Sequence, residues 1–272
     1  MDIRGNLEKM FSLEGKVIIL TGATGGIGEA LALGLSRAGG NMILTGTREE
    51  KLQEVCDRIR AEEGAAQPFL LDMRKKEELQ PFVDAVMKQY GHIDVLVNCA
   101  GVNRRWGMLD FSEEEYDRIM DINLKNIYFL TQAVGRCMVK AGRGNIINIA
   151  SYNSTGMLGG CSVYGASKSA LYALTRSEAV EWAQYGIRAN AVAPGHILTP
   201  MTKINWETDR ADYLRPRIAM ERPGKPEELV GVLIWLASDA SSYMTGQMVN
   251  VDGGYLAGGT PWHYDTEWES RY

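Results

Sequence analysis

The sequence predicts an α/β protein built on a doubly wound parallel sheet of seven strands, with helices on both faces. Short runs rich in Val, Ile and Leu recur along the chain and are apolar throughout, as strands buried on both faces of a parallel sheet require. Segments with helical spacing separate these runs and are long enough to cross over between parallel strands. Because no linker or internal repeat interrupts the alternation, we expect residues 1–272 to form a single domain.

The apolar runs and the helical segments can be placed in order along the chain. The runs VIIL, MILT, PFLL, DVLVN, NIINIA, RANAVA and MVNV predict strands at residues 17–20, 42–45, 68–71, 94–98, 145–150, 188–193 and 248–251. The helices are predicted between them at residues 26–38, 49–63, 75–90, 113–140, 163–185 and 226–239.

Glycines and polar residues collect where six of the seven strands stop. The segments, in order, are TGATGGIG, TGTR, a single Asp, NCAG, ASYNS and APGHILT. In a doubly wound sheet, ligands bind in the crevice beyond the carboxyl ends of the strands. A purely structural sheet does not need such residues there, so the pattern predicts a ligand-binding crevice.

Composition limits the classes of partner. The net charge is −5 and no long block of Lys and Arg occurs, so nothing indicates binding to nucleic acid or to a membrane. Four cysteines and three scattered histidines lack metal-ligand spacing, so we expect no metal site and a reduced compartment. No run of 18 apolar residues occurs and the N-terminus is charged, so we expect a soluble, cytoplasmic protein.

The first strand end has the chemistry of a phosphate site. Gly22, Gly26 and Gly28 follow a strand and open a helix, where glycine permits a tight turn and lets backbone N–H groups approach a pyrophosphate. No GK[ST] follows these glycines, which argues against a nucleotide-hydrolysing loop. Further along, Tyr164 and Lys168 stand four residues apart and share one helix face, although this pair alone is a weak signal.

Taken in order, these motifs resemble the short-chain dehydrogenase/reductase family over nearly the whole chain. Ser151 precedes Tyr164 by 13 residues, as the family pattern asks. The stretches FSLEGKV and NCAGVNRRWG resemble the sugar-acid branch of the family, which includes gluconate 5-dehydrogenase and 2-dehydro-3-deoxygluconate 5-dehydrogenase. The matching motifs are TGATGGIG at 21–28, Asp72, NCAG at 98–101, Asn123, Ser151, Tyr164 with Lys168, Pro194, Gly195, Thr199 and VDGG at 251–254.

The resemblance implies a Rossmann-type fold and an NAD(P)(H)-dependent oxidoreductase that interconverts a secondary alcohol and a ketone. Tyr164 would be the acid/base, and Lys168 would lower the pKa of its phenol, which is about 10 when free. Ser151 would position the substrate oxygen, and Asn123 would bind a water that links Lys168 to solvent. All four residue types are present. A regulator that senses NADP without turnover would lack part of this set, and it remains only a remote alternative.

Cofactor residues are likewise implied by the resemblance. NADP(H) is favoured over NAD(H), because Gly46 stands where NAD-using members carry Asp, and Arg48 follows at once. Gly25 argues the other way, since many NADP-using members carry a basic residue there. The implied cofactor-binding residues are Gly22, Thr24, Gly26, Ile27, Gly28, Thr47, Arg48, Asp72, Met73, Asn98, Ala100, Gly101, Tyr164, Lys168, Pro194, Gly195, Ile197 and Thr199.

The substrate residues are expected after three strand ends. Arg104 and Arg105 can hold a carboxylate, which favours a sugar acid or another polyhydroxy carbonyl compound. Apolar neighbours keep open a hydrophobic or cyclic, steroid-like ketone, whereas an acyl-carrier-protein ester would need a broader basic surface. The full substrate set is Arg104, Arg105, Trp106, Ser151, Asn153, Met157 and His196.

Two expectations concern surfaces. The segment 163–185 mixes small residues with Leu and Trp, and members of the family form dimers or tetramers through this helix, so we expect a homo-oligomer. The residues after VDGGYLAGG continue as TPWHYDTEWESRY, which is too aromatic for a typical disordered tail. We expect this tail, 260–272, to dock on its own or a neighbouring subunit, near a substrate mouth.

Overall fold

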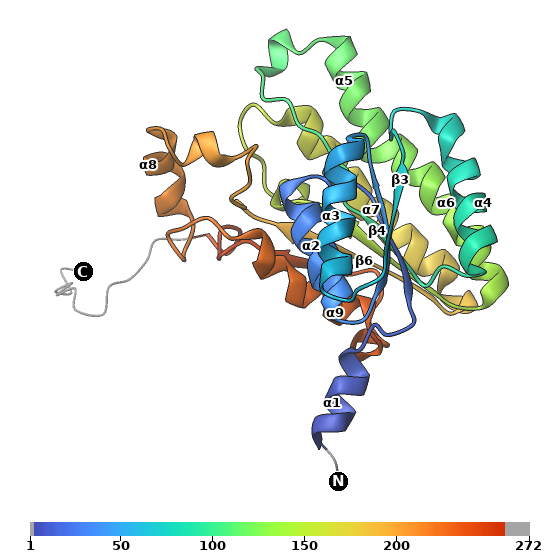
Figure 1. Cartoon of the computed structure of the whole chain (residues 1–272). Helices are drawn as coiled ribbons and strands as arrows, with labels where there is room; N and C mark the ends of the chain where they lie inside the picture. The colour runs from blue at the N-terminus through green and yellow to red at the C-terminus, as the bar shows by residue number, and fades with distance from the viewer. Residues whose placement is uncertain (1–2, 259–272) are drawn as a thin grey trace.

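The computed structural model describes residues 3–258, which form one seven-stranded sheet with helices on both faces (Figure 1). All the strand pairings are parallel, and the strand order is β3-β2-β1-β4-β5-β6-β7. The predicted fold class is confirmed. The strands are β1 Val17–Leu20, β2 Asn41–Gly46, β3 Ala66–Leu70, β4 Val95–Asn98, β5 Gly144–Ile149, β6 Ile187–Pro194 and β7 Met248–Val251.

Two apolar cores lie on opposite faces of the sheet because side chains alternate along each strand. Ile18 and Leu20 of β1 belong to the first core, and Val17 and Ile19 belong to the second. The first core is covered by α2 (Gly26–Arg37), α3 (Glu49–Ala61) and α9 (Val230–Ala237). The second is covered by α4 (Leu79–Tyr90), α6 (Asn126–Ala141) and α7 (Ser162–Trp182).

The register brings the strand ends to one edge. Leu20 of β1 pairs with Leu44 of β2 and with Val97 of β4, so the turns that follow these three strands lie side by side. Ile149 of β5 pairs with Val192 of β6 in the same way. Because the strands are parallel, the six polar segments found in the sequence meet at the same edge of the sheet.

The helices differ from expectation in several places. A π-helical turn, η3 (Asp121–Lys125), separates α5 (Glu113–Met120) from α6, so the segment expected as one helix is interrupted. A 3-10 turn, η8 (Pro226–Leu229), precedes α9. Two helices were not expected, α1 (Ile3–Phe11) and α8 (Arg210–Leu214), and α1 extends away from the body of the fold (Figure 1).

Within the described residues, no helix combines the length and the apolar character that a membrane crossing needs.

Candidate active site

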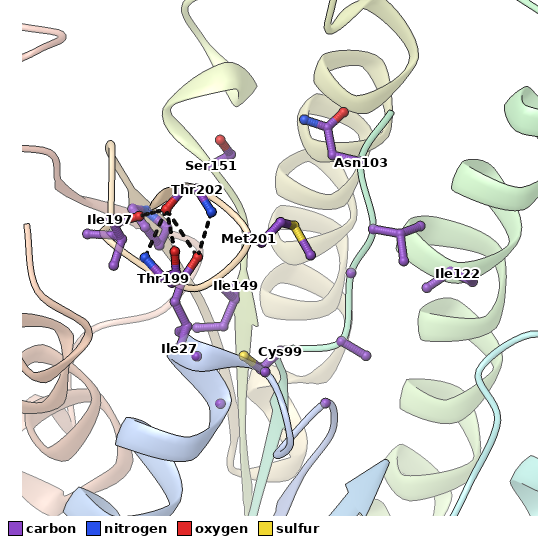
Figure 2. Close-up of a pocket in the computed structure, with 18 of the residues that line it drawn as sticks. Ile27, Cys99, Asn103, Ile122, Ile149, Ser151, Ile197, Thr199, Met201 and Thr202 are labelled. Carbon is purple, nitrogen blue, oxygen red and sulfur yellow. Dashed lines mark hydrogen bonds between the residues drawn. The ribbon is translucent and has the colours of Figure 1, made fainter. Parts of the chain in front are cut away.

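A cleft of about 970 Å³ opens at the carboxyl ends of the strands. The glycine-rich turn after β1 lines it, together with the segments that follow β2, β3, β4, β5 and β6. Most of the predicted site residues therefore come together, although they lie far apart in the sequence. Figure 2 shows part of this lining, with Ser151, Cys99, Asn103 and Met201 contributed by different segments.

At two positions in the turn after β1 only glycine fits. Gly22 has a φ of +69°, and a Cβ there would lie 2.8 Å from the Cα of Ala100. A Cβ on Gly28 would overlap the carbonyl oxygen of Gly22. The helix α2 begins at Gly26, so its first backbone N–H groups face the cleft. This close backbone approach to a helix start fits a pyrophosphate.

At the end of the cleft next to β2, Arg48 has no carboxylate partner among the described residues. Arg48 donates from Nη2 to the backbone oxygen of Thr24 at 2.5 Å, and within residues 3–258 no ion pair engages it. A Cβ on Gly46 would come within 3.0 Å of the Thr24 methyl group, so Thr24 crowds the position where an acidic side chain would stand. Lys51 also lines this end, but it pairs with Glu29 at 3.5 Å and is therefore partly neutralised.

Asp72 lines the cleft beyond β3 but is not free. Its carboxylate accepts two hydrogen bonds from Arg74 Nε, each 3.0 Å long, and one from Arg74 Nη2 at 2.6 Å. Hydrogen bonding to Arg74 holds the pKa of Asp72 below its usual value, against the opposing effect of partial burial. The pair therefore presents a nearly neutral surface to this end of the cleft, beside the cleft-lining Met73.

Lys168, Tyr164 and Ser151 meet in the middle of the cleft. Lys168 is buried and donates from Nζ to the carbonyl oxygen of Ile149 at 2.7 Å, and this Nζ lies 5.9 Å from the centre of the Tyr164 ring. Burial lowers the pKa of Lys168 to about 8. Burial likewise raises the pKa of Tyr164, and a hydrogen bond with Ser151 partly offsets it. The pKa of Tyr164 is raised because burial outweighs this hydrogen bond, and the lowering by Lys168 stays a prediction.

Asn123 lies behind these residues, away from the cleft wall. It sits in the π-helical turn and bonds Val102 twice, accepting from its N–H at 2.8 Å and donating to its carbonyl at 2.9 Å. Its amide also donates to Ser167 Oγ at 3.2 Å. A Cβ added to Gly101 would be 3.5 Å from Asn123 Oδ1 and 3.4 Å from Lys168 Nζ, so the two side chains approach each other there.

Asn98, predicted to bind the cofactor, does not line the cleft. Its amide nitrogen donates to Thr131 Oγ1 at 2.9 Å and to Asn148 Oδ1 at 2.8 Å. Asn148 in turn donates to Thr175 and to the buried carboxyl of Glu178. This polar network ties β4 and β5 to α6 and α7. The Asn98 side chain is therefore engaged inside the fold.

Four of the seven predicted substrate residues line the cleft: Arg105, Ser151, Asn153 and His196. Arg105 donates to Asn205 at 3.4 Å, and Asn153 accepts from the backbone of Leu158 at 3.0 Å. Arg104 instead stacks on Trp106, with its guanidinium carbon 4.7 Å from the ring centre. Arg104, Trp106 and Met157 are exposed and lie outside the lining.

His196 stands in an aromatic group at this end of the cleft. The ring centres of Tyr152 and Tyr255 each lie 5.0 Å from that of His196, and Trp206 lies 6.1 Å away. Burial lowers the pKa of His196 to about 4, with help from Arg105 and Arg210, so the imidazole is neutral at pH 7. Its Nε2 is buried and has no hydrogen-bond partner in the described residues.

The segment after β6 closes over the glycine-rich turn. Thr202 donates to the carbonyl of Ile197 at 2.6 Å, and its hydroxyl accepts from the Thr199 N–H at 2.8 Å (Figure 2). A Cβ added to Gly26 would lie 2.9 Å from Thr199 Cβ, so this segment rests directly on the start of α2. The predicted residues Pro194, Gly195, Ile197 and Thr199 all line the cleft there.

Several lining residues were missed from the sequence. Asn205 and Trp206 come from a 3-10 turn and the residue after it, well beyond the end of β6, and Arg118 comes from the last turn of α5. Their spacing carries no signal, because the tertiary fold alone brings them to the cleft. Tyr152, Asn103 and Cys161 adjoin motifs that were recognised, so proximity to a strand end was the available signal.

The parallel sheet, the glycine-rich turn and the group formed by Ser151, Tyr164 and Lys168 define the class of short-chain oxidoreductases. The chain belongs to the short-chain dehydrogenase/reductase family. The family model described as "Enoyl-(Acyl carrier protein) reductase" matches residues 22–256.

The chain is similar to family members of more than one named activity. It is 40% identical to a 3-oxoacyl-(acyl-carrier-protein) reductase of Thermotoga maritima, covering 90% of this chain and 99% of that protein. It is 39% identical to a 2-dehydro-3-deoxy-D-gluconate 5-dehydrogenase of Escherichia coli, covering 91% and 98%. A structure of a gluconate 5-dehydrogenase from Burkholderia cenocepacia, in complex with NADP and tartrate, superimposes with a TM-score of 0.90 at 35% identity, covering 93% and 100%.

Proposed function

We propose that the protein is an NADP(H)-preferring dehydrogenase that interconverts a hydroxyl and a ketone on a sugar acid. The proposal rests mainly on the position of Arg105, which lines the same cleft as Ser151, Tyr164 and Lys168. The three latter residues provide acid/base chemistry, and the guanidinium provides a carboxylate-binding group.

Proton transfer falls to Tyr164. Its hydroxyl gives a proton to the ketone oxygen in reduction and takes one from the alcohol in oxidation. Ser151 already bonds Tyr164, so a substrate oxygen held by Ser151 is brought next to the phenol. When bound, the nicotinamide supplies or accepts the hydride. Lys168 approaches Asn123 next to Gly101, and Asn123 in turn accepts a hydrogen bond from the Val102 N–H, so these residues would carry the proton on from Tyr164.

The residues at the cleft fit a dinucleotide. Gly22, Gly26 and Gly28 leave room for the pyrophosphate at the start of α2, and Ile197 with Thr199 would face the nicotinamide. Arg48, with no carboxylate partner in the described chain, supports a 2′-phosphate and therefore NADP. A kcat/KM for NAD well above that for NADP would contradict this preference.

Arg105 and His196 support a sugar acid as the class of substrate. A guanidinium binds a carboxylate in a fixed two-pronged geometry, and a neutral imidazole with a free Nε2 suits a substrate hydroxyl. The sugar-acid names of similar proteins support the same class. The aromatic rings of Tyr152, Trp206 and Tyr255 favour a second candidate, a hydrophobic or cyclic ketone.

The experiment is a panel of sugar acids, neutral polyols and cyclic ketones, assayed by NAD(P)H absorbance with both cofactors. We expect turnover of a sugar acid, and Arg105→Met should raise its KM about 10- to 100-fold, because a charge-assisted pair contributes about 1.5–3 kcal/mol. Arg104→Met is the matched control, since Arg104 stacks on Trp106 outside the cleft lining. Equal effects of the two variants, or turnover of cyclic ketones alone, would contradict the sugar-acid proposal.

We also infer that the protein is a homo-oligomer. The outer face of α7 exposes Ala166, Ala173 and Val180, and small residues allow close packing of a second helix. Light scattering of the purified protein distinguishes a dimer or tetramer from a monomer, and a monomer at micromolar concentration would contradict this inference.

A further inference from the structure

Arg105 and Asn205 meet in the cleft although they lie 100 residues apart in the sequence. Arg105 follows β4, and Asn205 is the last residue of the 3-10 turn η6 (Lys203–Asn205), which lies beyond β6. Nη1 of Arg105 donates to Oδ1 of Asn205 at 3.4 Å, and both residues line the cleft. The bond is longer than the usual distance of about 2.9 Å, so a ligand can compete for either group.

This bond determines which end of the Asn205 amide is free. A carboxamide has one acceptor oxygen and one NH₂ group that donates, and here the oxygen faces the cation. Among residues 3–258, no hydrogen-bond partner engages Nδ2 of Asn205, nor Nε and Nη2 of Arg105. Both residues therefore keep N–H donors that a ligand can use.

The position of Asn205 is set by a segment that is itself tied down. The backbone N–H of Asn205 donates to the carbonyl oxygen of Thr202 at 2.9 Å, and the Thr202 hydroxyl donates to the carbonyl oxygen of Ile197 at 2.6 Å (Figure 2). The next residue, Trp206, contacts His196, with the two ring centres 6.1 Å apart. Asn205 is therefore held against the cleft rather than carried by a free loop.

The charges at this end of the cleft suit an anion. Among the described lining residues, the only carboxylates are those of Glu29 and Asp72, and each pairs with a cation. Within the same part of the chain, no ion pair engages Arg105. A neutral amide next to this guanidinium leaves its charge available, whereas a carboxylate there would cancel it. The tail at 260–272, expected near a substrate mouth, lies outside the described residues.

We propose that Arg105 and Asn205 form one carboxylate-binding pair, in which Asn205 is a specificity-determining residue. Arg105 supplies the charge, and Asn205 supplies an amide donor while its oxygen holds the guanidinium in place. The pair rests on the sugar-acid function proposed above and assigns a second residue to it. A substrate held here by its carboxylate presents a carbon further along its chain to Ser151 and Tyr164, which line the same cleft.

The test compares D-gluconate with D-glucitol, which has the same carbon chain but a neutral CH₂OH group in place of the carboxylate. Isothermal titration of the full chain saturated with NADPH gives both Kd values, since the reduced cofactor cannot oxidise either ligand. We expect the unaltered protein to bind D-gluconate about 10-fold more tightly or better. Asn205→Leu should weaken D-gluconate about 10-fold and D-glucitol less than about twofold, because only the carboxylate makes a charge-assisted bond to the amide.

Asn250→Leu is the matched control. Asn250 is exposed on β7 and lies outside the cleft lining, so both Kd values should stay within about twofold of those of the unaltered protein. Equal effects of Asn205→Leu on the two ligands, or no effect on D-gluconate, would overturn the pair and leave the sugar-acid function standing. An unaltered protein that does not prefer D-gluconate would contradict the sugar-acid function itself, and the pair with it.

A double-mutant cycle determines whether the two residues bind the same carboxylate. We expect Arg105→Met/Asn205→Leu to weaken D-gluconate by less than the product of the two single effects, because each single change already disrupts the shared site. Asn205→Asp keeps the size of the side chain and serves if the leucine variant does not fold. Its carboxylate neutralises Arg105, so the preference for D-gluconate over D-glucitol should disappear. Independent single effects, or a preference that survives Asn205→Asp, would show that the two residues do not act as a pair.

Discussion

Lys168 donates a hydrogen bond from Nζ to the carbonyl oxygen of Ile149, and this bond joins α7 to the end of β5. Ile149 stands two residues before Ser151, so the bond fixes the distance between the lysine and the serine. Tyr164 is one turn before Lys168 on the same helix. The three side chains are therefore tied together by the backbone of α7 and the end of β5, an arrangement that suits the positioning of a substrate.

Replacing Tyr164 by phenylalanine should remove turnover without removing dinucleotide binding. In the proposed mechanism the hydroxyl is the acid/base, and loss of such a group lowers kcat by about 10²- to 10⁴-fold. The ring is kept, so the Kd for NADPH should stay within about twofold of the unaltered value. Stopped-flow turnover and fluorescence titration measure the two quantities. Tyr152→Phe, a phenol in the same cleft, is the control and should keep most activity.

Arg48 should decide between the two nicotinamide cofactors. Arg48→Ser should raise the KM for NADP about 10- to 100-fold and leave that for NAD nearly unchanged, because hydrogen bonds to a charged group contribute about 1.5–3 kcal/mol. Lys51→Gln serves as the control. Lys51 lines the same end of the cleft but is already paired with Glu29 and Glu54, so its loss should change the KM much less. Similar losses for NAD and NADP would contradict the assignment of Arg48 to the 2′-phosphate.

The glycine-rich turn offers a matched pair of alanine substitutions. Gly28→Ala places a methyl group against the Gly22 carbonyl, so the turn must shift; dinucleotide affinity should fall at least 10-fold, and overpacking should cost about 1–3 kcal/mol of stability. In Gly25→Ala the nearest atom is 3.5 Å away, an ordinary contact, so both quantities should change little. Isothermal titration and urea unfolding of both variants provide the comparison. Unchanged binding by Gly28→Ala would show that the turn does not hold the pyrophosphate.

Glu178 should make stability depend on pH. Burial raises the pKa of its carboxyl from 4.5 to about 7, against a hydrogen bond from Asn148 that lowers it. Between these values the folded protein holds a proton that the unfolded chain has lost. The free energy of unfolding therefore falls as the pH rises through this window and is level above pH 7.

The variant Glu178→Gln has no such charge to bury. It should exceed the unaltered protein by on the order of 3 kcal/mol at pH 8 and match it near pH 4.5. Urea unfolding at the two pH values measures the difference. Glu181→Gln, at an exposed position on the same helix, is the control and should show no such crossover. A stability difference between Glu178→Gln and the unaltered protein that does not change with pH would contradict the raised pKa.

The strands could be predicted because strands buried on both faces of a parallel sheet appear in the sequence as continuous apolar runs. The run VIIL at 17–20 coincides with β1, and MVNV at 248–251 coincides with β7. The strand-end rule then located the cleft, since Gly22, Ser151 and Gly195 all follow strands. The position of a residue directly after a strand is fixed by the order of the chain and by the backbone geometry of the strand. Local sequence patterns can therefore predict it.

Other features depend on contacts that no local pattern encodes. The π-helical turn that holds Asn123 reads as continuous helix, because its residues have ordinary helical spacing. The direction in which a side chain points could not be predicted from the sequence either. Arg104 and Arg105 are neighbours of the same type, yet only Arg105 reaches the cleft, while Arg104 stacks on Trp106. Adjacent residues in a loop point apart, and packing alone decides which one faces inward.

The parallel arrangement of the seven strands has an evolutionary consequence. Most of the cleft lining comes from loops at one edge of the sheet and lies outside the two apolar cores, so these loops can diverge without unfolding the sheet. This separation explains how one chain can resemble an acyl-carrier-protein reductase and a sugar-acid dehydrogenase to nearly the same degree. Overall sequence identity therefore measures the shared framework of the sheet and its cores, and it does not distinguish between the substrates of these relatives.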